Sequence, residues 1–571
     1  MGVSQSIVAH RSDRRRNASA ARTTLGSRSS NRPGGHVSES TADREALRAA
    51  AATGTLLSHW AGRQPEAVAI SSEHGDRSFS ELDAEANRLV RALRRRGLAD
   101  GDGVAAMIAN RAEFAVVYAA TQRAGLRFTP INWHLTADEV TYIVDDSEAR
   151  AFIADARYSV VAATAGAAAP GATTRLAVAG AIDGFESYAE AIDREDPDPL
   201  ADPSAGTSML YTSGTTGRPK GVHRSRAAAA AAAALATRNR WALPPLDYQP
   251  GESLHLCTGP AYHAAPLAFS LAGPLAAGVG VVLMDGWSAA ETLRLIDEHR
   301  VTHSHMVPTM FHRMLSLPEA DRQRFDGTSL RYVWHGAAPC PVTVKHAIID
   351  WWGPVLLEYY AATEGTGTWV ASEEWLTRPG TVGRIPAERH IRILDDEGRE
   401  QPPGCTGTIY LRAAEGGRFE YFKDADKTAQ SYRDDYFTLG DVGYLDEDDY
   451  LYLTDRSADL IISGGVNVYP AEIEAELLDH PAVGDVAVIG VPDAEWGESV
   501  LAVVELQPDR VASDGLAAEL IAHCRSRLAN YKCPRSVDFV DRLPRADNGK
   551  LYKRRIRDQY RARATEAGAG P

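Results

Sequence analysis

Apolar residues recur along the chain with two periods, which predict helices and strands in alternation from about residue 47 onward. One apolar stripe, with the spacing of a helix face, consists of Leu82, Ala86, Leu89, Val90 and Leu93. We expect Ser80 to cap this helix and Gly97 to close it. Short apolar runs on either side, Ala67–Ser71 and Val104–Ile108, predict buried strands. Such alternation is typical of layered α/β folds.

The alternation continues through residues 112–360 and changes in character near residue 456. Beyond that point a smaller α+β pattern begins, with strand runs Val486–Val491 and Val500–Leu506 and a helical run Leu516–Leu528. The sequence therefore predicts a large layered N-terminal α/β domain and a small α+β C-terminal domain. The expected segments are a disordered extension (1–40), the N-terminal domain (41–455), a hinge (456–459), the C-terminal domain (460–560) and a frayed tail (561–571).

The first forty residues contain seven arginines and two acidic residues but almost no bulky apolar side chains. Such a segment cannot bury enough apolar surface to offset the loss of conformational entropy, so we expect disorder. Met1-Gly2 with Ser6 matches a myristoylation signal, and the composition resembles that of a transit peptide. A disordered extension, or a start codon assigned too far upstream, is the preferred interpretation.

Charge and cysteine content exclude several classes of protein. The chain has 76 acidic and 61 basic residues and a net charge of −15, so we expect no nucleic-acid partner. Its five cysteines form no C-x-x-C pair and no cluster with histidine, which argues against a disulfide scaffold or a zinc site. The same feature favours a reducing compartment and hence a cytoplasmic location.

One uncharged stretch, Ala264 to Met284, is about long enough to span a bilayer. Proline and glycine residues interrupt it repeatedly. We therefore expect a buried helix, a turn and the core strand Val279–Leu283 there, and no integral membrane contact.

The most informative segment is the string YTSGTTGRPKG from Tyr211 to Gly221. Its glycines free the backbone to point N–H groups at phosphate oxygens, its hydroxyls add donors, and a lysine closes the loop. A P-loop requires G-x-x-x-x-G-K-[ST], and Arg218-Pro219 breaks that spacing. A plain hydrophilic turn explains the glycines and threonines but not the whole string. The residues expected to hold phosphate are Thr212, Ser213, Gly214, Thr215, Thr216, Gly217 and Lys220.

Further motifs follow in order along the chain: Gly259–His263, His335–Pro339, Tyr360–Glu364, Thr438–Asp441, Ile462–Gly465 and Pro544–Lys550. Together with the loop, they resemble the signature of the ANL superfamily of adenylate-forming enzymes. That superfamily includes acyl-CoA synthetases, the adenylation domains of peptide synthetases, and luciferases. The resemblance covers residues 47–560 and is strongest to free-standing bacterial acyl-CoA synthetases. It implies that the small C-terminal domain is mobile.

The resemblance implies an ATP site with a defined nucleoside side. Tyr360 would stack on adenine beside Gly336 and Ala337, Asp441 would accept from both ribose hydroxyls, and Arg456 would reach the ribose or a phosphate. Considered alone, an acidic residue such as Asp441 would be interpreted as a solvated surface carboxylate. The matched order of the motifs along the chain reverses that interpretation.

Joining ATP to a carboxylic acid brings two anions together, so the site must supply positive charge and oriented donors. By resemblance, Thr363 would donate to the α-phosphate and Glu364 would ligate Mg²⁺. Lys550, one of only seven lysines, would arrive from the small domain and lie against the reacting oxygens. His263 would orient the carboxylate of the acid; a core histidine with satisfied hydrogen bonds is the equally weighted alternative.

For the second step the resemblance implies that the small domain rotates about Ala458 and withdraws Lys550. CoA would then enter past Gly464 and Gly465, near Lys532. Two positions depart from the family pattern: Ala361 replaces the usual glycine, and Ala458 replaces the usual Asp or Lys of the hinge. A hinge needs backbone freedom more than a particular side chain, so we still expect rotation.

The implied reaction is ATP-dependent activation of a carboxylic acid as acyl-adenylate, followed by transfer to CoA with release of AMP and pyrophosphate. The expected pocket segments are poor in fixed charge, so the acid is expected to be mainly apolar: fatty, aryl or polycyclic. His303, His305 and His335 are expected to line this pocket and not to bind metal.

Two alternatives stay open. A ligase that passes the activated group to an amine or another nitrogen nucleophile would have the same motifs. A non-catalytic paralogue that senses nucleotide or acid is disfavoured, because Lys550, Glu364 and Asp441 are all present. The sequence does not fix the oligomeric state, and a homodimer is the assembly considered.

Overall fold

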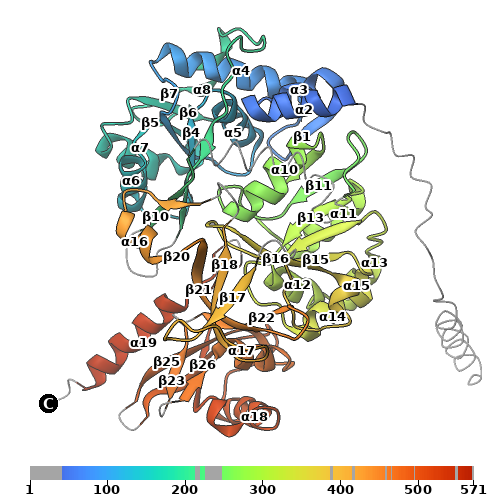
Figure 1. The fold of residues 1–571 in the computed structure, drawn as a ribbon, viewed down its shortest axis with the longest axis vertical. Coiled ribbons are helices and arrows are strands. Elements are labelled where there is room, and N and C mark those ends of the chain that lie inside the picture. Colours follow the sequence, from blue (N-terminus) through green and yellow to red (C-terminus); the bar gives the residue numbers. More distant parts are fainter. Residues whose placement is uncertain are drawn as a thin grey trace, which may run out of the picture. The chain divides into compact units, whose positions relative to one another are not determined.

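Two largely parallel sheets contain most of the strands in the first two thirds of the chain (Figure 1). The computed structural model describes residues 41–212, 219–225, 247–385, 390–413, 418–456, 459–463, 466–493, 496–546, 549 and 551–568. The chain divides into two units, Met1–Ala46 and Leu47–Pro571, and all of the sheets belong to the second. The predicted disordered extension, residues 1–40, lies outside the described residues.

The larger sheet has the strand order β16-β15-β14-β13-β11-β12-β1-β2. Its inner strands are parallel, whereas β16 and β2 at the edges run antiparallel to their neighbours. The bounds are β1 (Val68–Ser72), β2 (Arg77–Ser78), β11 (Leu254–Cys257), β12 (Gly280–Leu283), β13 (His303–Met306), β14 (Tyr332–His335), β15 (Leu356–Ala361) and β16 (Thr366–Ala371).

The second parallel sheet has the order β7-β6-β5-β3-β4-β8. All five residues of β3 are buried, as expected for a central parallel strand covered on both faces. The bounds are β3 (Gly103–Met107), β4 (Arg127–Pro130), β5 (Ala149–Asp155), β6 (Thr174–Val178), β7 (Glu186–Ser187) and β8 (Thr207–Ser208). Strands β1 and β3 confirm the two apolar runs that the sequence marked as buried strands.

Helices join the strands of both sheets and bury their apolar faces against them. Together, sheets and helices confirm the predicted layered α/β fold. The helices are α2 (Thr41–Thr53), α3 (Leu56–Arg63), α4 (Phe79–Arg95), α5 (Ala112–Arg123), α6 (Ala137–Asp146), η1 (Ala156–Tyr158), α7 (Ser159–Ala168), α8 (Tyr188–Asp193), η2 (Pro266–Ala272), α10 (Gly273–Ala276), α11 (Ala289–Glu298), α12 (Pro308–Leu315), α13 (Glu319–Arg324), α14 (Val342–Trp352) and α15 (Ser372–Trp375).

The predicted N-cap of α4 was wrong by two residues. The cap is Ser78, whose hydroxyl accepts from the backbone N–H of Glu81 (3.2 Å), while the Glu81 carboxylate accepts from the N–H of Ser78 (2.8 Å). Ser80 lacks this reciprocal arrangement, because Asp83, three residues later, accepts from the buried Arg123 at 2.6 Å. The capping box therefore fixes the start of the helix.

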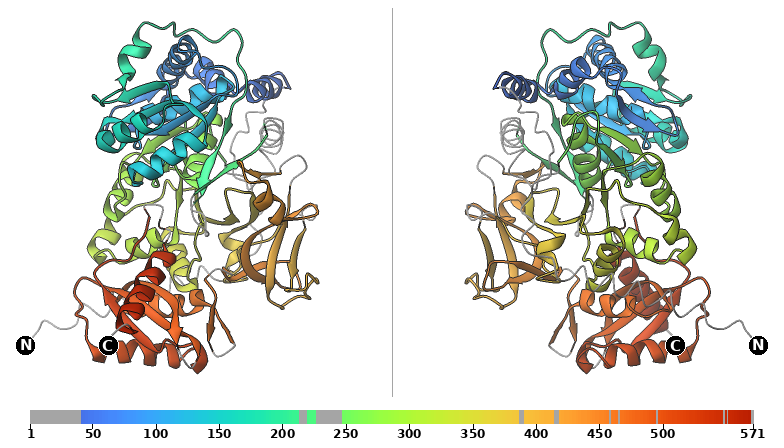
Figure 2. Two further views of the ribbon diagram at one scale, coloured as in Figure 1. Left: turned by 90° about the vertical axis from the view of Figure 1, so that its left-hand side faces the viewer. Right: turned by 90° about the vertical axis from the view of Figure 1, so that its right-hand side faces the viewer.

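Antiparallel strands from residues 391–456 form a separate group, drawn in gold and orange in Figure 2. They are β17 (Ile391–Leu394), β18 (Gly407–Arg412), β20 (Tyr432–Arg433), β21 (Tyr436–Leu445) and β22 (Leu451–Arg456). A three-stranded sheet of order β19-β10-β9 joins β9 (Leu210–Thr212) and β10 (Lys220–His223) to β19 (Glu420–Tyr421), which is followed by α16 (Ala425–Gln430).

The C-terminal α+β segment has its own sheet and core. Its sheet consists of β23 (Ile461–Ser463), β24 (Val466–Val468), β25 (Val483–Asp493), β26 (Gly497–Leu506) and β27 (Ser536–Val540). Its helices are α17 (Pro470–Leu478), α18 (Asp514–Arg525), η3 (Asn530–Lys532) and α19 (Lys553–Gly568). Helix α19 runs well into the segment that we expected to be a frayed tail.

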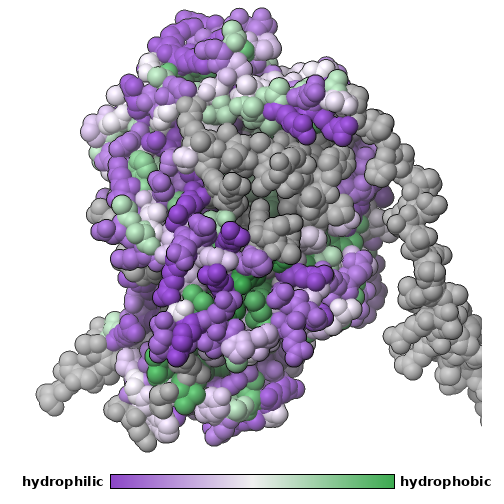
Figure 3. Space-filling view, in the orientation of Figure 1, coloured by the Kyte–Doolittle hydropathy of each residue, from purple (hydrophilic) through white to green (hydrophobic). Residues whose placement is uncertain are grey.

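The uncharged stretch from Ala264 to Met284 folds as η2, α10 and β12, which confirms the predicted helix, turn and strand. Its first helix is a π-helix, which the sequence pattern did not predict. Among the described residues, no helix combines the length and apolar character needed to cross a bilayer. The face shown in Figure 3 is mainly hydrophilic, with apolar side chains in small groups.

Candidate functional site

The carboxyl ends of four parallel strands meet at one edge of the larger sheet. Strands β11, β13, β14 and β15 lie in one parallel run, and each leads directly into a segment that the sequence singled out. These segments are 259–263, 307–309, 335–339 and 360–364. In open α/β sheets, ligands bind at this edge. The fold thus gathers the expected acid-binding, adenine-binding and phosphate-binding segments.

The strands β9 and β10 form a hairpin that carries the phosphate-loop string. Thr212 and Lys220 are opposite each other in the register, so both ends of the loop are fixed. The candidate residues Ser213, Gly214, Thr215, Thr216 and Gly217 lie outside the described residues. Lys220 Nζ donates to Asp424 Oδ2 at 2.6 Å. This contact raises the pKa of Lys220 and lowers the pKa of Asp424.

The Thr363–Glu364 turn follows β15 and is held from three sides. Its own backbone bonds close the loop, with the N–H of Ala362 donating to the Gly365 carbonyl (2.9 Å) and the reverse bond at 3.2 Å. Tyr421 donates its hydroxyl hydrogen to Glu364 Oε1 at 2.9 Å. Arg224 Nη2 donates to the carbonyl oxygens of Thr363 (3.1 Å) and Glu364 (2.8 Å).

Tyr360 and Asp441, the two residues expected on the nucleoside side, are in direct contact. The Tyr360 hydroxyl donates to Asp441 Oδ2 at 2.7 Å, and both residues are buried. Asp441 is opposite Arg456 in the β21–β22 register, so the backbone of Arg456 lies beside this pair. The structure does not describe the Arg456 side chain.

The segment after β14 approaches its neighbour closely at Gly336. A Cβ atom at this position would lie 2.6 Å from the carbonyl oxygen of Tyr359, so only glycine fits without a shift. Ala337 follows with a φ of 67°, a left-handed conformation that non-glycine residues adopt at a cost. Gly336 and Ala337 therefore form a constrained backbone segment next to the strand that carries Tyr360.

Beneath this segment lies a buried charged group. Lys345 Nζ on α14 donates to Glu358 Oε2 on β15 at 2.5 Å, and neither side chain reaches solvent to any extent. Burial raises the pKa of Glu358 and holds the pKa of His335 well below its ordinary value. His335 is therefore a neutral, buried side chain, as its predicted lining role requires.

Aromatic side chains gather beside the carboxyl ends of β13, β14 and β15. Phe269 from η2 stacks on Trp334 and on His305, with ring centroids 5.3 and 5.7 Å apart. His305 Nε2 and the Tyr359 hydroxyl are 2.8 Å apart. Burial lowers the pKa of His305 to about 3, so the imidazole is neutral at physiological pH. This group provides an apolar wall with one neutral polar contact.

His263 lies at the start of the segment that leads into η2. Its backbone N–H donates to the Pro260 carbonyl at 3.1 Å, which closes a turn. Its half-buried ring lies 4.3 Å from the ring of Tyr262, which itself packs edge-on against Trp133. His263 thus lies at the sheet edge, in the segment expected to bind the acid.

The C-terminal lysine loop reaches the same edge of the sheet. A Cβ atom on Gly549 would lie 2.4 Å from Thr309 Oγ1 and 2.7 Å from Val307 Cγ2, so the loop backbone rests directly on this segment. A cavity of about 170 Å³ lies between Gly549 and the segment Thr258–Pro260. Lys550 itself lies outside the described residues. The position of Gly549 nevertheless brings the loop that carries Lys550 to the site.

Arg545 fixes the backbone of this loop. Its guanidinium makes two bonds to the Asp485 carboxylate, at 2.5 and 2.6 Å, and donates to the carbonyl oxygen of Gly549 at 2.7 Å. Arg545 is also bridged to Leu551 across the loop. The clamp joins strand β25 to the residue that precedes Lys550.

The residues expected to act in the second step are only partly described. Ala458, Gly464 and Gly465 lie outside the described residues. Lys532 is half-buried and bonded to both carboxylate oxygens of Glu472, at 2.8 and 2.7 Å. Near the β23–β24 hairpin, Trp496 is 38% exposed and Arg535 lies 4.1 Å above its ring.

Sequence reasoning missed several residues at the phosphate side of the site: Arg224, Tyr421 and Asp424. Arg224 had a detectable signal, because it is four residues after Lys220 on an extended segment and therefore shares its face. Tyr421 and Asp424 belong to no motif, and only the pairing of β10 with β19 brings them to the loop.

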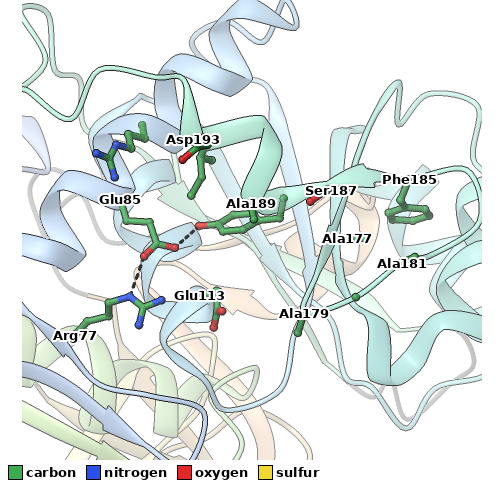
Figure 4. A pocket seen from close by; sticks show the side chains of 14 residues that line it. Arg77, Glu85, Glu113, Ala177, Ala179, Ala181, Phe185, Ser187, Ala189 and Asp193 are labelled. Carbon is green, nitrogen blue, oxygen red and sulfur yellow. Dashed lines mark hydrogen bonds and ion pairs between the residues drawn. The ribbon is translucent and has the colours of Figure 1, made fainter.

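A second cavity lies elsewhere, among residues 77–193. It measures about 650 Å³ and is lined by α4, α8 and the segment that joins β6 to β7. Glu85 accepts from Arg77 Nε and from the Tyr188 hydroxyl, each at 3.0 Å. Figure 4 shows Arg77 and Glu85 pointing toward each other at this cavity. None of the predicted site residues lines this cavity. The predicted site residues therefore gather at the sheet edge and not in this cavity.

Comparison with known families gives two matches. Residues 57–417 match the family model described as AMP-binding enzyme, and residues 472–550 match the model of the AMP-binding enzyme C-terminal domain. The second match includes the lysine loop. The two matches together cover most of the chain.

Curated relatives align along nearly the whole chain. The fatty acid–[acyl-carrier-protein] ligase ScoC of Streptomyces coeruleorubidus is 32% identical over 88% of this chain and 95% of its own length. The indoleacetate–CoA ligase of Aromatoleum aromaticum is 32% identical over 89% of this chain and 99% of its own length. The crystal structure of ATP-bound MatB from Rhodopseudomonas palustris is 30% identical, covers 89% of this chain and 99% of its own, and superposes with a TM-score of 0.76.

Proposed function

The chain belongs to the AMP-binding enzyme family. From that membership we propose a role for each site residue in the reaction. It is an AMP-forming acid–CoA ligase of the adenylate-forming superfamily, and its co-substrates are ATP, with Mg²⁺, and CoA. It activates a mainly apolar carboxylic acid as acyl-adenylate and then transfers the acyl group to CoA. The observation that carries the proposal is the contact of Gly549 with Val307 and Thr309, which seats the lysine loop on the ligand-binding edge of the sheet.

In the first step, the acid carboxylate attacks the α-phosphorus of ATP, and pyrophosphate leaves. Tyr360 and Asp441 hold the nucleoside, and Asp441 accepts from the ribose hydroxyls. Thr363 donates to the α-phosphate. Lys550 places its charge where negative charge builds up on the transferred group, which lowers the barrier electrostatically. Arg456, Gly336, Ala337 and the loop from Thr212 to Lys220 complete the ATP site.

Glu364 fits the role of a Mg²⁺ ligand. Mg²⁺ prefers oxygen donors and is usually held by one or two carboxylates together with substrate phosphates. Among the described residues, Tyr421 is the hydrogen-bond donor to the Glu364 carboxylate and binds Oε1 at 2.9 Å, which leaves Oε2 for a cation. The ion would neutralise charge on the triphosphate.

In the second step, the thiol of CoA attacks the acyl carbonyl and AMP leaves. Lys550 has to withdraw for this step, so we place the hinge at residues 456–459, around Ala458, between the domains 41–455 and 460–560. CoA passes Gly464 and Gly465 and is held near Lys532. The exposed Trp496, with Arg535 over its ring, provides an aromatic and cationic surface on the same domain.

The acid is bound between the segment carrying His263 and the aromatic group of Phe269, His305, Trp334 and Tyr359. No charged side chain belongs to that group, and His305 is neutral, so an apolar acid is favoured over a dicarboxylic one. Among the relatives, ScoC acts on a fatty acid and the Aromatoleum enzyme on indoleacetate. We therefore propose a fatty, aryl or polycyclic acid.

The test is an ATP–pyrophosphate exchange screen over fatty, aryl, polycyclic and dicarboxylic acids, followed by acceptor assays with the best acid. We expect exchange with apolar acids only and thioester formation with CoA. Acyl transfer to an amine but not to CoA would favour the alternative of a ligase for nitrogen nucleophiles. Transfer only to the thiol of a carrier protein, the acceptor in the name of ScoC, would also overturn the CoA assignment. Absence of exchange with every acid would favour a non-catalytic sensor.

The remaining parts of the proposal are a cytoplasmic location and a homodimeric assembly. All five cysteines are free thiols, which suits a reducing compartment. Light scattering on the purified full-length chain decides between a monomer and the homodimer.

A further inference from the structure

Two basic residues follow the phosphate loop, one on strand β10 and one directly after it, and they differ in how their charges are paired. Lys220, at the start of the strand, has its charge matched by Asp424 at 2.6 Å. Arg224 follows the end of the strand, four residues later, where an extended chain presents it on the same face. Among the residues that the structure describes, Arg224 has no carboxylate oxygen within ion-pair distance.

Arg224 is half-buried, and its hydrogen bonds go to neutral groups. Nη2 donates to the carbonyl oxygens of Thr363 and Glu364, at 3.1 and 2.8 Å, which leaves the positive charge uncompensated. Burial lowers the pKa of Arg224, and the attraction of the Glu364 carboxylate offsets this only in part. A partly desolvated charge without a partner destabilises the protein unless an anion binds to it.

The backbone contacts fix the place of this charge. Arg224 donates to the turn whose side chains, Thr363 and Glu364, are the proposed ligands of the α-phosphate and of Mg²⁺. Val222, two residues earlier, pairs with Tyr421, and Tyr421 in turn donates to Glu364. The guanidinium is thus tied to the phosphate side of the site by a strand, a turn and a side-chain hydrogen bond.

We propose that Arg224 binds the triphosphate of ATP as a cation that no described carboxylate compensates, while its Nη2 also holds the Thr363–Glu364 turn in place. Arginine suits both tasks, because its planar fork offers five donors in fixed directions, so one nitrogen can hold the turn while others face phosphate oxygens. The inference rests on the proposed function, since it presupposes that ATP binds at this edge.

The test is isothermal titration of the full-length chain with Mg·ATP and, separately, with AMP. Arg224→Leu removes the charge and the donors, whereas Arg224→Lys keeps the charge but loses the planar fork of donors. Arg399→Leu is the matched control, since Arg399 is an exposed arginine paired with Asp395 on a surface turn. Melting temperatures of all variants show whether each has folded.

We expect Arg224→Leu to weaken Mg·ATP binding about tenfold or more, because a charge-assisted phosphate contact is lost. AMP binding should fall by less than about threefold, since AMP lacks the two outer phosphates. Arg224→Lys should recover part of the Mg·ATP affinity, and Arg399→Leu should match the wild type.

Equal loss of Mg·ATP and AMP affinity in Arg224→Leu would overturn the proposal, because Arg224 would then serve only the turn. Unchanged Mg·ATP affinity in a folded Arg224→Leu would overturn it as well. A failure of the proposed function looks different: the wild type and the Arg399→Leu control would then bind no Mg·ATP, and the assignment of Arg224 would fall with it.

Discussion

The Tyr360 hydroxyl donates to Asp441 Oδ2 at 2.7 Å, a bond between residues 81 positions apart in the chain. Tyr360 is the penultimate residue of strand β15 in the largely parallel sheet, whereas Asp441 lies in the antiparallel strand β21. The bond therefore joins two sheets at the nucleoside side of the site. It also engages one oxygen of the Asp441 carboxylate and so restricts the orientation of that group.

This bond predicts the effect of Tyr360→Phe. The ring remains to stack on adenine, but a hydrogen bond to a charged group is lost, which is worth about 1.5–3 kcal/mol when such a group is buried. We expect the KM for ATP to rise by roughly tenfold or more, with a smaller change in kcat and in the KM for the acid. Steady-state kinetics with ATP and acid varied in turn provide the measurement.

Tyr359→Phe is the matched control, because the neighbouring tyrosine bonds to His305 on the acid side. It should change the KM for the acid and leave that for ATP nearly unaltered. If both variants alter the same KM, the assignment of Tyr360 to the nucleoside and Tyr359 to the acid is wrong.

The clamp between Arg545 and Asp485 predicts a selective defect in the first half-reaction. Asp485→Asn weakens two charge-assisted bonds that hold the residue preceding Lys550. We expect adenylation, measured by pyrophosphate release, to fall about tenfold. Thioester formation from supplied acyl-adenylate should change little, since Lys550 is not needed there.

The control for the clamp is Asp509→Asn, which removes an exposed acidic residue next to Arg510 on the same domain. Both half-reactions should keep wild-type rates in this variant. A parallel loss of both half-reactions in Asp485→Asn would mean that the clamp stabilises the domain as a whole and does not position the loop.

The hinge prediction concerns Ala458→Pro. Proline fixes φ near −65° and removes the backbone N–H, so a residue that must change conformation between the steps becomes locked. We expect adenylation to survive and thioester transfer to fall steeply, with acyl-adenylate accumulating. Wild-type rates for both steps would place the hinge elsewhere, with Ser457 or Asp459 as the next residues to vary.

Local sequence patterns predicted the elements well and their long-range partners poorly. Strands β1, β3 and β12 and helix α4 follow from apolar periodicity alone, because burial on the sheet decides them. The start of α4 did not follow, since Ser78 and Ser80 both suit a cap and the reciprocal bonds between Ser78 and Glu81 fix the start at Ser78.

The motifs likewise identified the segments at the sheet edge but not the contacts between them. The partnership of Lys220 with Asp424 depends on the pairing of β10 with β19, which are about two hundred residues apart. No periodicity or spacing encodes such a pairing. The backbone bonds of Arg224 to the Thr363–Glu364 turn were hidden for the same reason.

We expect the protein to lose stability in acid, because it contains a buried histidine with a lowered pKa. Burial lowers the pKa of His305 to about 3, whereas in the unfolded chain it is near 6.5. Between these pH values the unfolded state therefore binds more protons than the folded state. The contribution of His305 to the free energy of unfolding is fully present above pH 6.5 and declines as the pH falls. The contribution of one such group is up to about 1.4 kcal/mol per pH unit.

Urea unfolding at pH 7.5, 6 and 5 measures this slope in the wild type and in His305→Gln. The variant is expected to be less stable at pH 7.5 but to lose less stability on acidification. Identical slopes in the two proteins would show that other groups, such as paired carboxylates, govern the acid sensitivity.

The central claim, that the lysine loop seated on the sheet edge delivers the catalytic charge for adenylation, is tested most directly by Lys550→Ala in separate half-reactions. Pyrophosphate release from ATP and acid should fall a hundredfold or more, equivalent to about 3 kcal/mol of lost transition-state stabilisation. Thioester formation from supplied acyl-adenylate and CoA should stay within about threefold of the wild-type rate. Equal losses in the two half-reactions would contradict the account, because Lys550 would then support folding or domain docking instead of the chemistry of the first step.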